Sequence, residues 1–379
     1  MGMPPIRFKL INTVDQVRQL KSDWECLYKE INDCNVFQSW DWNYAWIETV
    51  YNPNLHNLHI VCGYADEELI LLLPLVQKIS KDDQLEFGFI AQGFSDYSDI
   101  LIHPDLQPNS SKLILRAIRK FNLTPWRLRF LPEWSPINLL IAETKYNKNW
   151  HFVEDEELNE EVFSKIELPK SIEEYFHSLS KNNRKNIRRA IRLIESKNIQ
   201  IEFHRKLSDE MISRLINFHI DNLKKNHQIT STYANVFHRN FLQKALKNMS
   251  DNKILMLVLL MDNQRWVVSD LLIVKGNWWI GYLTGMDRDY AELSPGRVSI
   301  FYTIKKAIET GVDVYDFGWG DESYKNYWNA NVWTPISGVL SYQSDLQRLV
   351  NDLRKKIRPR TRIRQLVDML KNTPNLSND

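Results

Sequence analysis

The spacing of apolar and polar residues predicts both strands and helices in the first half of the chain. "LHIVCGYADEELILLLPLVQKI" (58–79) places two apolar runs around an acidic turn, which predicts a hairpin. Apolar residues at intervals of three and four predict helices, as in 39–51, where Trp42, Ala45, Trp46 and Thr49 share one face. In chain order we expect a strand at 8–12, helices at 14–30 and 39–51, the hairpin, extended segments at 85–92 and 98–102, a helix at 110–121 and a strand at 126–132.

The second half repeats this order of elements with little residue identity. Helices are predicted at 171–197, 208–225 and 232–248, strands at 253–261, 266–274 and 278–286, a helix at 295–309 and a strand at 312–319. Gly311 follows the helix, where a left-handed residue satisfies the last carbonyl groups. The repetition predicts an α/β protein whose two halves share one architecture.

Length and charge place a domain boundary between the halves. A chain of 379 residues is long for a single hydrophobic core. The segment "EDEELNEE" (154–161) has six acids in eight residues and is typical of a solvated linker or edge. We therefore predict domains at 1–155 and 156–345, followed by a basic helical tail at 346–379.

Composition narrows the class of protein. With 43% apolar and 25% charged residues the chain is typical of folded globular proteins, and a net charge of +2 gives no overall attraction to nucleic acid. Three cysteines without metal-type spacing favour reduced thiols in a cytoplasmic protein. The longest apolar run, 69–76, is far shorter than the ~20 residues that cross a bilayer. We expect a soluble, cytoplasmic protein.

The helix start "SPGR" (294–297) is a candidate anion site. Ser294 suits the N-cap and Pro295 the first turn. Gly296 lets a ligand approach the backbone, and the helix N-terminus together with Arg297 favours an anion such as a pyrophosphate. The alternative is an ordinary capped helix start.

A second candidate is "DFGWGDESYKNYW" (316–328), which follows a predicted buried strand. Gly318 and Gly320 allow the backbone to turn sharply. The charged and phenolic side chains of Asp321, Glu322, Tyr324 and Lys325 follow directly. Trp319 and Trp328 are candidates for the floor of a sugar or acyl site. The alternative is a structural turn with surface charges.

Together, the strand pair 266–286, the Pro-Gly helix start and the Asp-Phe-Gly-x-Gly-Asp-x-x-Tyr-Lys stretch resemble the GNAT acyltransferase superfamily. The branch they resemble most is the cellulose-biosynthesis-type acetyltransferases, which are related to the Fem-type peptidyltransferases. The resemblance covers about 165–335, and the first half resembles a degenerate copy only in element order. It implies tandem GNAT-like domains, each a mixed, mostly antiparallel sheet flanked by helices.

The resemblance also implies acyl transfer from acyl-CoA, with residues that bind this donor at two places. An acyl-pantetheine arm pairs with an exposed strand edge at Leu283, Thr284 and Gly285, and the phosphates lie at Ser294, Gly296 and Arg297. In one respect the sequence departs from the family, because the usual phosphate loop has two closely spaced glycines and only Gly296 is present here. Fem-type relatives, which use aminoacyl-tRNA, also lack the usual loop, so tRNA stays open as a partner.

Within the implied reaction, Asp321 or Glu322 is the candidate base and Tyr324 the acid for the leaving thiolate. Lys325 is a candidate to hold an anionic acceptor or the oxyanion. Asp270 interrupts an apolar strand and either faces the substrate or bonds to a neighbouring loop. No metal-ligand spacing is present among the histidines, so we expect no metal. The resemblance implies acyl-CoA as co-substrate.

Two basic segments complete the candidate set. A capping box at Ser171 and Glu174 begins a helix that continues with six positive charges in twelve residues: Lys181, Arg184, Lys185, Arg188, Arg189 and Arg192. This face fits an anionic acceptor, the phosphates of CoA, or RNA, and the alternative is a solvated helix face. The tail segment 352–371 is basic and amphipathic, which fits peripheral contact with a membrane or with synthesis machinery, and the alternative is a solvated C-terminal helix.

We therefore expect transfer of an acyl group, acetyl above all, to an amine or hydroxyl of a sugar, an amino-acid-like compound or a polysaccharide precursor. The alternatives are a Fem-like aminoacyl-tRNA-dependent transferase and a non-catalytic binding subunit of a polysaccharide-synthesis assembly.

Overall fold

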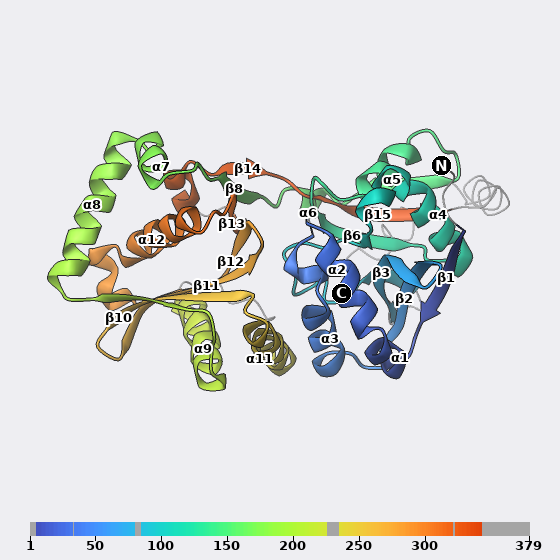
Figure 1. Ribbon diagram of the computed structural model, residues 1–379, viewed down its shortest axis with the longest axis horizontal. Helices are drawn as coiled ribbons and strands as arrows, with labels where there is room; N and C mark the ends of the chain where they lie inside the picture. Colours follow the sequence, from blue (N-terminus) through green and yellow to red (C-terminus); the bar gives the residue numbers. More distant parts are fainter. Residues whose placement is uncertain (1–4, 33, 80–84, 226–234, 321–322, 343–379) are drawn as a thin grey trace, which may run out of the picture.

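A computed structural model describes residues 5–32, 34–79, 85–225, 235–320 and 323–342 of the chain. Two α/β units lie side by side along the long axis of the molecule (Figure 1). The predicted tail at 346–379 and the candidate residues Asp321 and Glu322 lie outside the described residues.

The first unit is built on an eight-stranded, mostly antiparallel sheet. Its order is β1 (Ile6–Ile11), β2 (His56–Ala65), β3 (Glu68–Ile79), β4 (Leu85–Phe89), β6 (Trp126–Leu131), β15 (Ile336–Tyr342) and β7 (Trp150–Glu154), and the short β5 (Leu101–Ile102) pairs with β3. The helical segments are α1 (Val14–Gln19), α2 (Lys21–Glu30), η1 (Val36–Gln38), α3 (Trp40–Thr49), η2 (Pro104–Asn109), α4 (Ser110–Phe121), α5 (Ile137–Thr144) and α6 (Glu156–Asn159).

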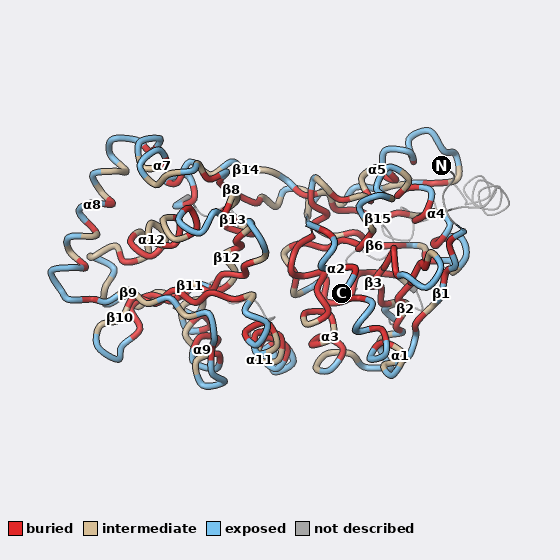
Figure 2. The backbone as a smooth tube through the Cα atoms, viewed as in Figure 1, coloured by how far each residue is buried: buried red, intermediate tan, exposed pale blue. Residues whose placement is uncertain are grey.

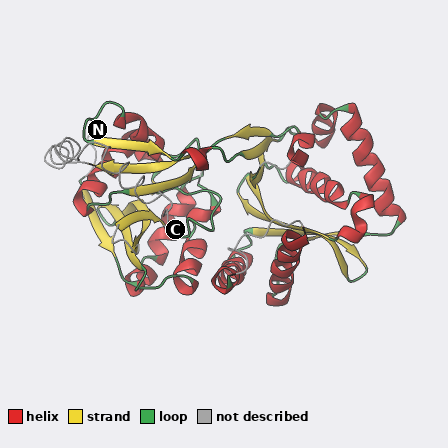
Figure 3. Ribbon diagram, turned by 180° about the vertical axis from the view of Figure 1, so that it is seen from behind, coloured by secondary structure: helices red, strands yellow, loops and turns green. Residues whose placement is uncertain are grey.

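The second unit is built on a seven-stranded sheet. Its order is β14 (Asn331–Trp333), β8 (Phe163–Glu167), β13 (Val314–Trp319), β12 (Trp278–Met286), β11 (Arg265–Lys275), β10 (Leu255–Asp262) and β9 (Gln200–His204). The helical segments are α7 (Ile172–Ser178), α8 (Lys181–Ser196), α9 (Asp209–Lys225), α11 (Val236–Asp251), η3 (Arg288–Leu293), α12 (Pro295–Glu309) and η4 (Ser323–Trp328). Helices α7, α8 and α12 lie on one side of this sheet, and α9 and α11 on the other (Figures 1 and 3).

A continuous core joins the two units. Helix α3 of the first packs on α11 of the second, where the Trp42 and Phe241 rings meet edge to face with centroids 4.8 Å apart. Both helices carry buried residues, drawn in red in Figure 2. Strand β15 returns from the second unit and pairs with β6 and β7 of the first. Residues 336–342, which we assigned to the second domain, therefore complete the first sheet, while the boundaries themselves stay predictions.

The fold class predicted from the sequence is confirmed: mixed α/β, with two mostly antiparallel sheets flanked by helices. The helix predicted at 14–30 is divided at Leu20, and the one at 171–197 is divided after Ser178. The second break arises because Ser180 starts a new helix, with its hydroxyl accepting a bond from the Asn183 amide. Among the described residues, no helix is both long enough and apolar enough to span a membrane.

Candidate active site at the fork between two strands

Strands β12 and β13 form a fork in the middle of the second sheet. They run parallel and paired only from Trp278 opposite Val314 to Ile280 opposite Asp316. Beyond that point β12 continues along β11 to Met286, while β13 turns toward β8. The edge of β12 from Gly281 to Met286 is therefore not paired with any described strand on the β13 side. Free backbone groups on such an edge are a ready binding surface for an extended ligand.

Side chains of α9 contact this edge. The Asp287 amide bonds to the Val267 carbonyl at 2.9 Å, so by alternation the backbone groups of Thr284 and Met286 face away from β11. The Thr284 carbonyl lies 2.7 Å from His219 Nδ1, and the Met286 amide donates to Asn222 Oδ1 at 3.4 Å. Burial lowers the pKa of His219, so the neutral ring carries its proton on Nδ1 and donates it to Thr284.

The three residues predicted to bind the donor arm differ in what they offer. Leu283 is buried and Gly285 faces α9, where a Cβ would lie 2.5 Å from the Phe218 ring. Glycine is thus needed at 285 for packing. Thr284 is the one whose backbone faces the unpaired edge, and His219 already occupies its carbonyl. A pantetheine arm that pairs there must displace this imidazole.

The N-terminus of α12 is accessible, as the sequence suggested, but is built differently. Ser294 adopts the left-handed region, with φ of 53°, and its hydroxyl does not cap the helix, so the predicted side-chain cap is wrong. No atom lies within 4 Å of a Cβ placed on Gly296, which leaves room above the backbone. The Arg297 guanidinium lies 5.5 Å from the ring centroid of Tyr327 in η4. This contact brings the predicted phosphate site beside the predicted catalytic segment.

The basic helix α8 borders the same region. Its Asn183 side chain donates to the Tyr327 carbonyl at 2.8 Å. Arg184 has a structural role, because its guanidinium donates to the backbone carbonyls of His177 and Leu179, both at 2.7 Å. The other five predicted cations are exposed: Lys181, Lys185, Arg188, Arg189 and Arg192. A strip of exposed positive charge therefore lies near the α12 N-terminus, as an anionic ligand requires.

Asp316 begins the segment singled out in the sequence and is fully buried at the fork. Its carboxylate accepts three hydrogen bonds, from the Tyr97 hydroxyl at 2.6 Å, from the Gly318 amide at 2.8 Å and from Trp278 Nε1 at 3.3 Å. Burial raises the pKa of Asp316, and these three bonds oppose that rise. Asp316 therefore holds the fork in place and does not face a substrate.

The turn after β13 has the predicted backbone. Gly318 and Gly320 have φ of 67° and 117°, a region that other residues rarely adopt. Lys325 is buried, and its ammonium donates to the carbonyls of Gly318, Trp319 and Gly320 at 3.3, 3.1 and 2.8 Å. These bonds support a role for Lys325 in shaping the turn. To contact an oxyanion as predicted, the ammonium would have to divide its N–H groups between the oxyanion and these carbonyls.

The aromatic residues of this segment divide into exposed and buried ones. Tyr324 is 38% exposed and its ring contacts Phe317, so its hydroxyl is a candidate acid within reach of solvent. Trp319 is 46% exposed and donates Nε1 to Glu161 at 2.6 Å. Trp328 is buried, with its carbonyl accepting from Tyr175. Of the two predicted floor residues, only Trp319 is accessible.

The first unit contributes an acid that the sequence analysis missed. Asp96 follows β4, and a Cβ placed on Gly318 would lie 2.8 Å from its Oδ2 and 3.1 Å from the Gly281 carbonyl. The carboxylate thus lies in the fork itself. Burial and the neighbouring Asp316 raise the pKa of Asp96 to about 7, while Lys325 and Arg129 oppose the rise. A carboxyl group with this pKa accepts a proton at neutral pH more readily than an ordinary one.

Asp270 bonds to two neighbouring side chains, but these lie on β12 and α12 rather than on a loop, as one of the two alternatives had predicted. Its carboxylate accepts from the Thr284 hydroxyl at 2.5 Å and from the Ser299 hydroxyl of α12. Burial raises its pKa, and both bonds oppose that change. The residue ties β11, β12 and α12 together beside the fork.

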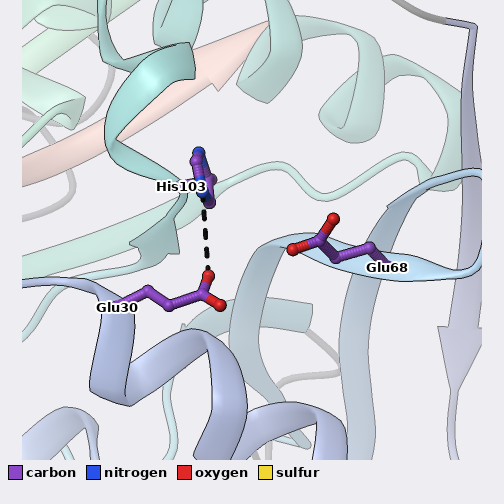
Figure 4. A group of neighbouring side chains, drawn as sticks. All are labelled: Glu30, Glu68 and His103. Atoms are coloured by element: carbon purple, nitrogen blue, oxygen red, sulfur yellow. Dashed lines mark ion pairs between the residues drawn. The ribbon is translucent and has the colours of Figure 1, made fainter.

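Among the residues that the structure describes, one group of side chains has atoms close enough to share a metal ion. Glu30, Glu68 and His103 converge at the ends of α2, β3 and β5, with His103 Nε2 3.7 Å from the Glu30 carboxylate (Figure 4). All three belong to the first unit, whereas the fork belongs to the second. Exposed acids often gather without binding an ion, and nothing links this group to the fork.

Comparisons with known proteins agree with this geometry. Residues 181–326 match the family model described as an acetyltransferase (GNAT) domain. No curated protein matches the sequence. The fold is similar to the crystal structure of FemX, with a TM-score of 0.60 and 10% identity over 91% of this chain and 99% of that one.

Two further structures are each matched over 90% of this chain. A conserved protein of unknown function from Bacteroides thetaiotaomicron has a TM-score of 0.52 and 13% identity, over 90% of this chain and 100% of that one. A tandem GNAT protein from the clavulanic acid biosynthesis pathway has a TM-score of 0.40 and 9% identity, over 90% and 100%. The segment that matches the GNAT acetyltransferase model, residues 181–326, contains most of the fork and the open start of α12, and the likeness to FemX extends the shared fold over both α/β units.

Proposed function

We propose that the protein transfers an acyl group from a phosphate-bearing carrier to an amine or hydroxyl acceptor at the fork. The observation that carries this proposal is the divergence of β12 and β13 after Ile280 and Asp316. It leaves a strand edge for the carrier arm, with an open helix N-terminus and a carboxyl group of pKa about 7 beside it. Acyl transfer requires these elements and little else.

In the proposed reaction, Asp96 removes the proton of the acceptor as its nitrogen or oxygen attacks the carbonyl carbon. The tetrahedral intermediate then expels the carrier, and the departing thiolate or alkoxide takes a proton from Tyr324. Asp321 and Glu322 remain alternative bases. Asp316, Tyr97 and Lys325 hold the two strands and the turn in position, as their hydrogen bonds support.

Acyl-CoA, acetyl-CoA above all, is the proposed donor. Its arm would lie along Gly281–Met286 and its phosphates at Ser294–Arg297, beside the exposed cations of α8. A second donor is favoured by a specific observation. Because His219 occupies the Thr284 carbonyl and Asn222 bonds to Met286, an arm that needs no strand pairing meets less competition. Aminoacyl-tRNA, the donor of the Fem-type relatives, is such a carrier and suits a strip of positive charge.

For the acceptor we propose a sugar, an amino-acid-like amine or a polysaccharide precursor. The resemblance to cellulose-biosynthesis-type acetyltransferases supports this range. Our proposal includes a role in polysaccharide synthesis in the cytoplasm, where the basic tail would contact a membrane or the synthesis machinery. A non-catalytic binding subunit of such an assembly remains the third candidate.

Calorimetric titration with acetyl-CoA and with charged tRNA tests the proposal. Binding of one donor, lost in Arg297→Glu but kept in Arg239→Glu, would support a site at the α12 N-terminus. Arg239 is a suitable control because it lies on α11 and bonds to Asn217. Failure of both donors to bind would reject both enzymatic candidates and leave the binding subunit.

A further inference from the structure

A cavity of about 300 Å³ lies on the first unit, between η2 and the turn that precedes α5. The residues that matter for its chemistry are Gln107, Glu133, Trp134, Asn138 and Leu139. Its volume is at the lower end of the range of about 300–1,000 Å³ found for small-molecule sites. It therefore has room for one ring rather than for a chain of them.

Contacts within the protein hold the side chains of the cavity wall in place before any ligand binds. The Trp134 ring packs against the rings of Trp278 and Trp333, with centroids 4.8 and 5.8 Å away, while it also lines the cavity. The Ser135 hydroxyl donates to the buried Asp99 at 2.7 Å. The Asn138 amide donates to the Pro132 carbonyl at 2.9 Å. A ligand would not have to order this wall, so little affinity is lost to reorganisation.

The polar groups favour hydroxyls over anions. The Glu133 side chain is 58% exposed, and Lys165, only 15% exposed, lies behind it with Nζ 2.5 Å from its carboxylate. The ammonium is also surrounded by the rings of Trp134, Trp278 and Trp333, at 5.5 to 5.6 Å. Because the cation is shielded and the carboxylate faces solvent, a phosphate is repelled, whereas a hydroxyl or ammonium group has an acceptor. Exposed Gln107 adds a neutral donor and acceptor.

The cavity is connected to the fork through one side chain. Trp278 packs on Trp134 at one side and donates Nε1 to Asp316 at 3.3 Å at the other. A ligand against Trp134 is thus one aromatic ring away from the residue that holds the two strands. The first unit, which also supplies Asp96, would then present the acceptor to the second.

We propose that this cavity binds a single neutral or amino-bearing sugar ring and serves as the acceptor subsite. An indole offers a flat apolar surface for the C–H groups of a pyranose, while the hydroxyls bond to Glu133 and Gln107. Its role as an acceptor subsite rests on the proposed acyl transfer. Its binding chemistry stands separately, since it depends only on the cavity.

The test is saturation-transfer NMR and calorimetry of the full chain with glucose, glucosamine, N-acetylglucosamine and, as an anionic probe, glucose 6-phosphate. We expect millimolar binding of at least one uncharged or amino sugar and at least tenfold weaker binding of the phosphate. Trp134→Ala should weaken sugar binding at least tenfold. Tyr146→Ala is the matched control, because Tyr146 is 92% exposed near the end of α5 and does not line the cavity.

Trp134→Ala removes part of a buried aromatic cluster, so a loss of folding must be distinguished from a loss of binding. Leu139→Trp answers this, because Leu139 is 50% exposed and a larger side chain there fills the cavity without disturbing the core. It should abolish sugar binding at an unchanged melting temperature. Sugar binding that persists in Leu139→Trp, or the absence of any sugar binding in the wild type, would overturn the proposal.

The subsite and the acyl transfer fail in different ways. If sugars bind in a Trp134-dependent manner but no donor is ever consumed, the subsite stands and the proposed enzyme does not. If the protein acylates amines without binding any sugar, the enzyme stands and the subsite is rejected.

Discussion

Replacing Asp96 by Asn should lower activity and raise stability at alkaline pH, two effects with one cause. The pKa of this carboxyl is raised from 3.8 to about 7, chiefly by burial and then by Asp316. The ionised form that accepts a proton in the reaction is therefore the form that the folded protein tolerates poorly. Asparagine keeps the shape of the side chain and removes both the basicity and the buried charge.

The magnitude follows from linkage between protonation and folding. The folded carboxyl binds its proton more tightly than the unfolded one, so the free energy of unfolding falls as pH rises from about 4 to about 7. A shift of about 3 units corresponds to at most ~4 kcal/mol at ~1.36 kcal/mol per unit. Because Asp96 is partly exposed and solvent screens its charge, we expect about 1–2 kcal/mol of added stability for Asp96→Asn at pH 8.

Loss of a general base typically costs about 10²–10⁴-fold in rate, so turnover should fall by at least about 100-fold. Release of free CoA thiol or deacylation of tRNA, whichever donor the titrations identify, measures this. In the wild type the rate should rise with pH to a plateau, with a midpoint near pH 7, set by Asp96.

Asp99 provides the matched control. Burial raises its pKa to about 7 as well, but it accepts bonds from Ser135 and the Ile100 amide rather than facing the fork. Asp99→Asn should flatten the pH dependence of stability and leave the pH–rate profile in place. A wild-type rate that does not change between pH 6 and 8, or an Asp96→Asn variant with normal turnover, would refute the reasoning.

Three further variants probe the same region. Gly318→Ala forces a side chain into a φ of 67° and to within 2.8 Å of Asp96 and 3.1 Å of the Gly281 carbonyl, so thermal unfolding should show a loss of about 2 kcal/mol or more. Lys325→Met leaves the carbonyls of Gly318, Trp319 and Gly320 without their ammonium donor and should cost about 3 kcal/mol in chemical denaturation, where a loss below ~1 kcal/mol would contradict the bonds described. His219→Ala frees the Thr284 carbonyl; if acetyl-CoA pairs there, calorimetry should show about fivefold tighter binding, worth ~1 kcal/mol for one hydrogen bond, and unchanged affinity would place the arm elsewhere.

Local patterns in the sequence predicted most of the second unit correctly. Helix α12 begins at Pro295 and ends at Glu309 as expected, because proline and Gly311 mark its two ends unambiguously. The helical spacing of Ile187, Ile191 and Ile194 in the sequence also corresponds to the inner face of α8, where Ile187 and Ile194 are buried and Ile191 is half-buried. The strand pairs β10 to β12 follow from their apolar runs.

What sequence spacing did not reveal are the contacts between distant segments. Asp96 and Tyr97 lie more than 200 positions before Asp316, so no local pattern places them in the fork; the Tyr97–Asp316 bond spans 219 residues. A signal was present in "GFSDYSD" (93–99), where acids and a tyrosine follow a strand, as they do after β13. The return of β15 to the first sheet was likewise hidden, because seven residues of strand do not indicate their partner.

For some candidate residues, the structural role differs from the one that the residue type alone had suggested. Lys325 has the charge of an oxyanion-binding residue, but its depth in the turn gives it three carbonyl partners. Ser294 has the side chain of an N-cap, but its left-handed backbone points that side chain elsewhere. Both outcomes depend on backbone geometry set by neighbouring strands.

Hydrogen–deuterium exchange with and without donor tests the central claim most directly, because it needs no knowledge of the acceptor. The account predicts that acetyl-CoA or charged tRNA slows amide exchange at Ser294–Val298 and within Gly281–Met286, and leaves β2 and β3 of the first unit unchanged. Protection confined to segments away from both the fork and the α12 N-terminus, or none with either donor, would contradict it.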